Sequence, residues 1–193
     1  MTLYSLRPHF ACVAFMCMAS CVQAQLVFNP TNQHYYERIS NTITWDTASA
    51  NATSNGGYLA TLTSQEENDF IVTSYGGSNI SGFHIGGTQP AGSQEPGGGW
   101  QWVTGETWSY TNWNGGEPND GAGVFPLENR LQYAWNAGNG TWNDILNTLA
   151  DGNTRGYIVE YNQAPVPAPS ALAAFVIGAV PGAAVLLRRR RKA

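Results

Sequence analysis

Alternating apolar and polar positions predict strands near both ends of the central region of the chain. Residues 26–39 place Tyr35-Tyr36 and Ile39 among polar neighbours, and residues 157–161 read Tyr-Ile-Val-Glu-Tyr. A further pattern, Leu-Gln-Tyr-Ala-Trp, occupies residues 131–135. Period-two patterns rich in aromatic and β-branched residues are typical of strands with one buried face. The region is therefore expected to begin and end with strands.

Two helices are predicted after the first strand. Residues 44–52 have Trp45 near their start and carry small residues on one face. Residues 64–73 begin with Ser64, three positions before Glu67, which is the spacing of a capping box. After this second helix the sequence contains no further helix signals.

Residues 82–145 predict short strands separated by long loops, because they are rich in Gly, Trp, Asn and Pro. Loops of this length are usually either functional or disordered, and the tryptophans argue against disorder. The Gly97-Gly98-Gly99 run lacks the strand, helix and Lys of a phosphate-binding loop. It is interpreted as a turn.

The charge of the chain is unevenly distributed. The formal net charge is −4, from nine basic and 13 acidic residues. Six basic residues lie in the first 24 or the last six positions, so the central region keeps three arginines against all 13 acids, a formal charge of −10. Nucleic-acid binding depends on clusters of Lys and Arg. Nucleic acid is therefore disfavoured as a partner, and a divalent cation is favoured.

The first 24 residues have the composition of a signal peptide. Arg7 precedes an apolar run at 10–19, and Val22-Gln23-Ala24 supplies a small-residue cleavage site, so residues 1–24 are expected to be removed. A lipobox that ends at Cys21, with lipid attached there, is the second interpretation. All three cysteines of the chain lie in this segment.

The last 30 residues form three consecutive segments. Residues 164–169 are a Pro-rich linker, residues 170–187 are an apolar run, and residues 188–193 are a basic tail. Eighteen apolar residues can just span the membrane as a helix, and the basic tail would stay cytoplasmic. This arrangement resembles a PEP-CTERM sorting signal, with Ala168 where that motif usually has Glu.

The PEP-CTERM resemblance implies a bacterial protein that is exported, cleaved by an exosortase, and displayed at the cell surface or in extracellular matrix. A plain C-terminal membrane anchor is the alternative. Both interpretations place the central region outside the cell.

Five oxygen-bearing side chains are the candidate binding residues of the central region. They are Glu117, Asn119, Glu128, Asn143 and Asp144. Calcium accepts six to eight oxygen ligands from carboxylates, amides, backbone carbonyls and water, so this set fits one Ca²⁺ ion. The structural alternative is that Asn and Asp are common in turns, where they satisfy local backbone groups.

A proline and a tryptophan are expected to position these five side chains. An X-Pro bond tolerates the cis form at a cost of only about 0.5–1 kcal/mol, and a cis Glu117-Pro118 bond would turn both flanking side chains to one side. Trp142 is expected to anchor Asn143 and Asp144 on a strand. The loop ligands and the strand ligands would then converge.

Six sequence features, in order, resemble a C-type lectin domain over about residues 25–163. They are Gly57-Tyr58-Leu59-Ala60-Thr61-Leu62, Ser64-Gln65-Glu66-Glu67, His84-Ile85-Gly86-Gly87, Glu117-Pro118-Asn119 with the later Glu128-Asn129, Trp142-Asn143-Asp144, and the strand 157–161. The resemblance implies an α+β fold with two helices, two small antiparallel sheets and a long calcium-site loop region. Animal members carry two disulfides, and here Arg130 and Val159 stand where that pattern places cysteines.

The resemblance also implies a function, that of an exported calcium-dependent lectin whose five candidate residues bind both metal and sugar. In the family, Glu-Pro-Asn accompanies mannose-type sugars, which include glucose, fucose and N-acetylglucosamine. A protein-binding or matrix-structural module of the same fold is the alternative. An enzyme is not expected, because the central region has no Cys nucleophile and calcium would occupy the carboxylates of Glu117 and Asp144, the pair that could mimic a glycosidase dyad.

Several residues near these motifs are further candidates. Residues 120–127 form an insertion that could alter selectivity or block the site, and Asp120 is either a ligand of an auxiliary calcium or an exposed acid in a turn. Candidates for stacking on a sugar ring are Phe125, Tyr133 and Trp135, although core packing is favoured for Trp135. His84 is expected to be structural.

Overall fold

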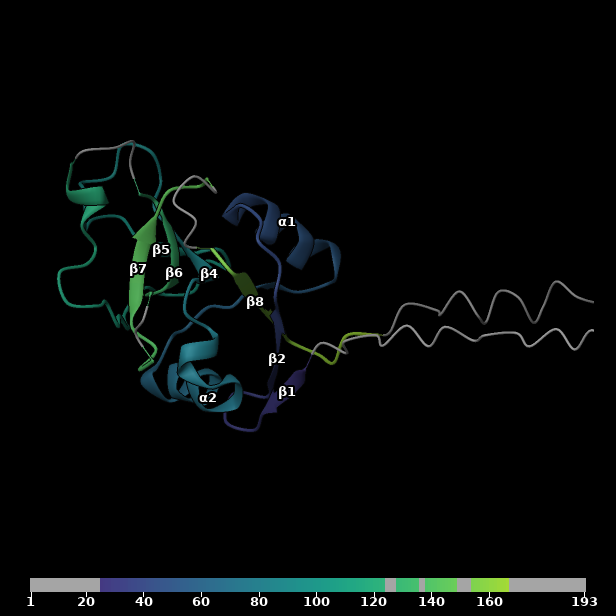
Figure 1. Ribbon diagram of the computed structural model, residues 1–193. Coiled ribbons are helices and arrows are strands. Elements are labelled where there is room, and N and C mark those ends of the chain that lie inside the picture. Colours follow the sequence, from purple (N-terminus) through teal and green to yellow (C-terminus); the bar gives the residue numbers. More distant parts are fainter. Residues whose placement is uncertain (1–24, 124–127, 136–137, 149–153, 167–193) are drawn as a thin grey trace, which may run out of the picture.

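The computed structural model describes residues 25–123, 128–135, 138–148 and 154–166 (Figure 1). Its strands are β1 (Leu26–Asn29), β2 (His34–Ile39), β3 (Tyr58–Leu59), β4 (Phe83–Thr88), β5 (Gln101–Trp102), β6 (Arg130–Tyr133), β7 (Trp142–Ile145) and β8 (Gly156–Tyr161). Its α-helices are α1 (Trp45–Ser54) and α2 (Gln65–Tyr75), and its 3-10 helices are η1 (Gly77–Asn79) and η2 (Asp120–Gly123). The α+β class and the two helices are as predicted from the sequence.

The strands form one eight-stranded sheet in the order β1-β2-β8-β4-β6-β7, with β3 paired to β8 and β5 paired to β4. The pairing of β4 with β8 is parallel, with Phe83 opposite Gly156, whereas the other pairs are antiparallel. This sheet differs from the expected two small antiparallel sheets. Alternation of side chains along a strand does not reveal its partner, and the parallel pair joins strands far apart in the chain.

The predicted first strand is a hairpin. It comprises β1 and β2, joined by a turn in which the Gln33 N–H donates to the Asn29 carbonyl at 2.9 Å. Asn29 also caps the turn, because its side-chain Oδ1 accepts from the Thr31 N–H at 3.0 Å. Asx turns of this kind explain why a continuous strand from 26 to 39 is interrupted.

The second helix begins at its predicted N-cap, Ser64, and the first begins after an N-cap at Thr44. The Thr44 hydroxyl accepts from the Thr47 N–H at 3.3 Å, and the Ser64 hydroxyl accepts from the Glu67 N–H at 3.2 Å. In a capping box the Glu side chain would accept from the N–H of the N-cap residue, Ser64. Here the Glu67 carboxylate accepts instead from the Thr63 N–H at 2.8 Å. Each helix runs two residues beyond the predicted end.

Small residues allow α1 to pack closely on the sheet. Ala48 and Ala52 are fully buried in a cluster with Leu59 and Val159. Val159, which stands where the C-type lectin pattern would place a cysteine, is instead part of this apolar cluster. Burial of apolar area contributes about 25 cal/mol per Å², so this contact stabilises the fold without a disulfide.

Trp142 lies at the centre of a second group of core residues, which is rich in aromatic side chains. Its ring is surrounded by those of Trp102, Trp108, Trp113 and Tyr110, with ring centroids 5.5 to 6.0 Å apart. Aromatic pairs at such separations contribute about 0.5–1.5 kcal/mol beyond area burial. The long loop rich in tryptophan is thereby fixed against the sheet.

The segment that follows β5 and contains η2 lies at the opposite side of the molecule from the two ends of the described chain (Figure 1). The predicted signal peptide at 1–24 and the predicted segments at 170–187 and 188–193 lie outside the described residues. Within the described ranges, the structure contains no helix with the length and apolar character needed to cross a membrane.

Candidate functional site

The β6–β7 hairpin positions two of the candidate ligands. Asn143 pairs with Gln132 and Asp144 pairs with Leu131 in antiparallel register. Trp142 precedes them and is fully buried, and its indole N–H donates to the Asn68 side chain at 3.2 Å. The anchoring role expected for Trp142 is therefore confirmed.

The loop after β5 is attached to β7 through Trp113. A parallel bridge joins Trp113 to Trp142: the Trp142 N–H donates to the Asn112 carbonyl at 2.7 Å, and the Asn114 N–H donates to the Trp142 carbonyl at 2.8 Å. The Glu117 N–H then donates to the Asn114 carbonyl at 2.9 Å, which closes a turn. This turn brings the loop ligands beside those of β7.

The Glu117-Pro118 peptide bond is cis, as predicted. Beyond it, the chain folds over the buried carboxylate of Asp144. The Asn119 N–H lies 3.1 and 3.0 Å from the two oxygens of this carboxylate, and the Asp120 N–H donates to Oδ2 at 2.8 Å. Asp144 thus orients the backbone that follows the proline.

A second set of contacts joins Asp120 to Glu128. The Glu128 N–H donates to the Asp120 carboxylate at 2.8 Å, and the Gly121 N–H donates to the Glu128 carboxylate at 2.7 Å. Asp120 and Gly121 have φ of 52° and 58°, the left-handed region, which Asp and Gly tolerate. Asp120 is partly buried and fastens Glu128, so it is not the freely exposed acid of a turn.

The electrostatics of this loop cluster centre on Glu117. Burial, a hydrogen bond with the Asp144 carboxyl, and the charges of Asp144 and Glu128 raise the pKa of Glu117 to about 7. Its Oε2 is buried and accepts no hydrogen bond within the described structure. A carboxylate oxygen without a donor, next to two other carboxylates, is a natural ligand for a cation.

The five residues fit calcium by their chemistry. Glu117 interacts electrostatically with Asp144 and Glu128, and the Asn119 backbone N–H and the Asn143 side-chain amide are each bonded to Asp144, so the five residues are neighbours. Carboxylate and amide oxygens are those that Ca²⁺ prefers. The Asp144 backbone carbonyl accepts from the Asn143 side-chain amide at 2.6 Å. In this arrangement the Asn143 amide therefore binds the backbone of the next residue.

A polar clamp that sequence reasoning missed joins the start of α1 to β6 and to the residues that follow β7. Asp46, the second residue of α1, accepts from Arg130 Nε at 3.0 Å and from the Asn147 amide at 2.6 Å, and its N–H donates to Asn147 at 3.0 Å. The Arg130 guanidinium also lies 4.9 Å from the Trp45 ring centroid. Arg130, which stands where the C-type lectin pattern would place a cysteine, is therefore bonded to the helix.

The three candidate sugar-stacking residues differ in their burial. Tyr133 is fully buried and cannot reach a ligand, whereas Phe125 lies outside the described residues. The prediction that Trp135 packs in the core is wrong. Its side chain is 38% exposed, because β6 ends at Tyr133. The Arg155 guanidinium lies 3.9 Å from the Trp135 ring centroid. His84 is buried in β4, with Nε2 3.0 Å from the Ile43 carbonyl, and is structural as expected.

The fold and the loop cluster define a lectin-type domain, and comparisons with known proteins agree. The chain belongs to the C-type lectin domain family, whose profile matches residues 41–148. It is 32% identical over 146 residues to halomucin of Haloquadratum walsbyi, which covers 66% of this chain and 1% of halomucin. It is 30% identical over 115 residues to the secretory phospholipase A2 receptor of Bos taurus, which covers 60% of this chain and 7% of the receptor. The chain therefore spans a small fraction of both relatives.

Solved structures with the same fold include both sugar-associated and calcium-independent proteins. The cow CD23 carbohydrate-recognition domain, solved in the presence of a GlcNAc2Man3 oligosaccharide, has a TM-score of 0.56 at 23% identity, covering 77% of this chain and 98% of that one. A calcium-independent type II antifreeze protein has a TM-score of 0.53 at 23% identity, covering 75% and 99%. At this identity the likeness shows the fold alone.

Proposed function

We propose that this domain binds carbohydrate in a calcium-dependent manner through the loop cluster of Glu117, Asn119, Glu128, Asn143 and Asp144. The observation that carries the proposal is the arrangement around Glu117. Its buried Oε2 has no hydrogen-bond donor in the described structure, and its pKa is raised to about 7 beside Asp144 and Glu128. Such a cluster of carboxylates is stabilised when a cation replaces the proton.

The chemistry of sugar binding follows from the side chains. Calcium, when bound, can accept two neighbouring sugar hydroxyls in its coordination shell. The carboxylates of Glu117 and Glu128 accept the protons of those hydroxyls, and the side-chain amides of Asn119 and Asn143 donate to their lone pairs. In C-type lectins the triplet Glu-Pro-Asn, here at 117–119, accompanies mannose-type sugars, and the proposal extends this preference to the present chain, including glucose, fucose and N-acetylglucosamine.

A protein-binding or matrix-structural role without sugar is the second candidate, and one contact favours it. The Asp144 carboxylate is bonded to the N–H groups of Asn119 and Asp120, so the loop has internal support that does not depend on a cation. The fold is also that of a calcium-independent antifreeze protein. No enzymatic role is proposed, since the carboxylates of the cluster are assigned to the cation.

The proposal includes display outside the cell, either at the surface or in extracellular matrix. The signal-peptide pattern at 1–24 and the sorting or anchor pattern at 164–193 support it. The segment that follows β5 and contains η2 lies on the opposite side from the two ends of the described chain (Figure 1), so attachment through either end would leave it exposed. Display of many copies would raise the avidity of single weak sites.

The substitution Glu117→Gln tests the proposal. It removes one carboxylate and keeps the shape of the side chain, so retention of the purified protein on immobilised mannose in calcium should be lost. Glu66→Gln, the same change at an exposed position of α2, is the matched control and should be retained like the wild type. Equal retention of the Glu117→Gln variant and the wild type would contradict the assignment.

A further inference from the structure

Strand β1 forms one edge of the sheet, because it pairs with β2 and with no other strand in the part of the chain that the structure describes. The N–H and C=O groups on its outer side are therefore available to a further strand. Such edges are usually shielded by charged side chains, by proline within the strand or by a covering segment. Residues 25–33 contain no charged residue, and Pro30 lies beyond the end of β1. The edge thus lacks side-chain charges that would keep another strand away.

Two large apolar side chains of this edge strand face the solvent. Leu26 is 40% exposed and Phe28 is 47% exposed. Because they are two positions apart in a strand, they lie on the same face of the sheet. Val27 points to the other face and packs against the core group that contains Tyr36. We call Leu26 and Phe28 the β1 strip.

The neighbours of the β1 strip on β2 leave it uncharged. Phe28 lies opposite Tyr35, and their ring centroids are 4.9 Å apart. Leu26 lies opposite Glu37, the one acid of β2. The Glu37 carboxylate accepts from the Tyr161 hydroxyl of β8 at 2.5 Å, so it is bonded on the side of β2 that lies away from β1. The edge therefore presents an apolar surface next to free backbone groups.

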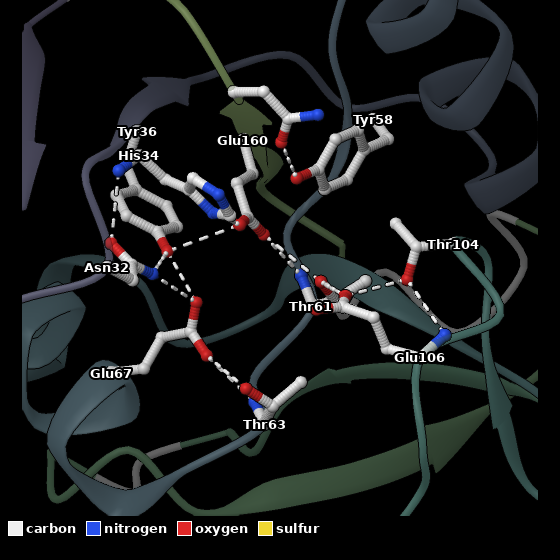
Figure 2. A network of polar contacts seen from close by, with 11 residues as sticks. Asn32, His34, Tyr36, Tyr58, Thr61, Thr63, Glu67, Thr104, Glu106 and Glu160 are labelled. Carbon is white, nitrogen blue, oxygen red and sulfur yellow. Dashed lines mark hydrogen bonds and ion pairs between the residues drawn. The ribbon is translucent and has the colours of Figure 1, made fainter.

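The hairpin that carries the β1 strip is fastened to the rest of the domain. Asn32, in the turn between β1 and β2, donates to the Tyr36 hydroxyl at 2.7 Å and to the Glu67 carboxylate of α2 at 2.9 Å. His34 Nδ1 lies 2.5 Å from the buried Glu160 carboxylate of β8. Figure 2 shows these side chains converging from the turn, the two strands and the helix. The edge is thus held in one form before binding, which lowers the entropic cost of an association.

We propose that two copies of this chain associate through β1, edge to edge, so that their two sheets become continuous. The charge of the chain favours a second copy as the occupant. Residues 25–166 have a formal charge of −10, so two copies repel each other over much of their surface. At β1 they can approach without placing carboxylates opposite one another, and the apolar strip of each copy covers that of the other. This inference does not depend on the proposed sugar site.

The alternation of side chains fixes the register of this contact. In an antiparallel pair about a twofold axis perpendicular to the sheet, residues that face each other must lie on the same face. A pair centred on Val27 meets this condition, and it places Leu26 of each copy opposite Phe28 of the other. A pair centred on Phe28 would place Pro30, which has no N–H, opposite Leu26. The register centred on Val27 is therefore preferred.

The contact is reversible, because β1 has only four residues and stable interfaces usually bury about 1,200–2,000 Å². Attachment of many copies to one surface would raise their local concentration and favour the pair. Each dimer would carry two loop clusters, so it would bind a multivalent glycan more tightly than a single chain does.

Sedimentation velocity of the full chain in detergent tests the inference. The wild type should pass from monomer to dimer as its concentration rises toward about 1 mM. Phe28→Lys places a charge on the edge and should weaken this dimer about tenfold or more. Val103→Lys, the same kind of change at an apolar side chain that is 37% exposed outside β1, is the matched control and should dimerise like the wild type. Association through the apolar run at 170–187 would be equal in all three proteins.

Disulfide cross-linking tests the register, and it also decides the matter if Phe28→Lys fails to fold. All three cysteines lie in the first 21 residues and are replaced by serine for this experiment. Leu26→Cys and Phe28→Cys chains with different tags, mixed and oxidised, should form the mixed disulfide in preference to either homodimer, because these two positions face each other across the pair. Val103→Cys chains, treated in the same way, should stay monomeric.

Three outcomes would overturn the inference. The first is a wild type that stays monomeric at every concentration, which would leave the β1 strip to another segment or partner. The second is equal dimerisation of wild type and a folded Phe28→Lys variant. The third is mixed cross-linking of Leu26→Cys with Phe28→Cys that does not exceed the homodimers and the Val103→Cys control.

Discussion

Calcium should stabilise this domain, and it should do so more strongly as the pH rises through about 7. Glu117 is the reason, because burial and the neighbouring carboxyls of Asp144 and Glu128 raise its pKa from 4.5 to about 7. Near pH 6 the cation must displace a proton from Glu117, whereas near pH 8 the carboxylate is already ionised. Apparent calcium affinity should therefore increase over this interval.

The size of the effect can be worked from this pKa. Ionisation of a single group with a pKa near 7 rises about tenfold between pH 6 and pH 8. Glu117 is only partly buried, so solvent screening reduces the expected increase in calcium affinity between pH 6 and pH 8 to roughly threefold to tenfold. At a calcium concentration 100 times the dissociation constant, the stabilisation is about 2.7 kcal/mol, or about 5–10 °C in Tm.

The cation-free protein should show the opposite trend with pH. Glu160 also has a pKa of about 7, raised by burial and then by the charge of Glu67. Groups whose pKa is raised on folding favour the folded state below their unfolded value of 4.5, and this contribution is lost as the pH rises through about 7. In EDTA, Tm should fall between pH 5 and pH 8.

Thermal unfolding at pH 6 and pH 8, in calcium and in EDTA, measures both trends. The difference in Tm between calcium and EDTA should be larger at pH 8. In Glu117→Gln this difference should be small at both values of pH. An equal calcium increment at pH 6 and pH 8 in the wild type would refute the assigned role of Glu117, and no increment at either pH would refute the metal site.

Two further substitutions test how the site is supported. Asp46→Asn weakens the bonds to Arg130 and Asn147. It should cost about 0.5–1 kcal/mol of stability in denaturant unfolding and lower the calcium affinity several-fold in a calcium titration. Unchanged calcium affinity would show that the clamp does not position the site. Trp142→Phe removes a fully buried indole and its bond to Asn68, and should cost about 2–3 kcal/mol in the same unfolding assay. A loss below about 0.5 kcal/mol would show that Trp142 is not the anchor of β7.

Local signals in the sequence were sufficient for features that depend on near neighbours. Ser64 caps α2 as predicted because its hydroxyl reaches the N–H group three residues away. Trp142 is buried because it lies on a strand with its ring toward the core. The family pattern led to the five candidate residues, and in the structure Glu117 interacts electrostatically with Asp144 and Glu128.

Features that depend on distant residues were not predictable in this way. The clamp joins Asp46 to Arg130 and Asn147, which are 84 and 101 positions away. The buried contact of His34 with Glu160 joins residues 126 positions apart, and neither set forms a recognisable local motif. Trp135 was assigned to the core from its apolar pattern, but the strand ends before it and leaves the ring exposed.

The central claim is that Glu117, Asn119, Glu128, Asn143 and Asp144 bind calcium and sugar together. Retention of the purified wild-type protein on mannose and galactose resins, first in calcium and then in EDTA, tests it most directly. The account predicts retention on mannose in calcium, release by EDTA, and no retention on galactose. Failure to bind either resin while calcium still raises Tm would contradict the lectin assignment and identify the domain as a protein-binding or structural module.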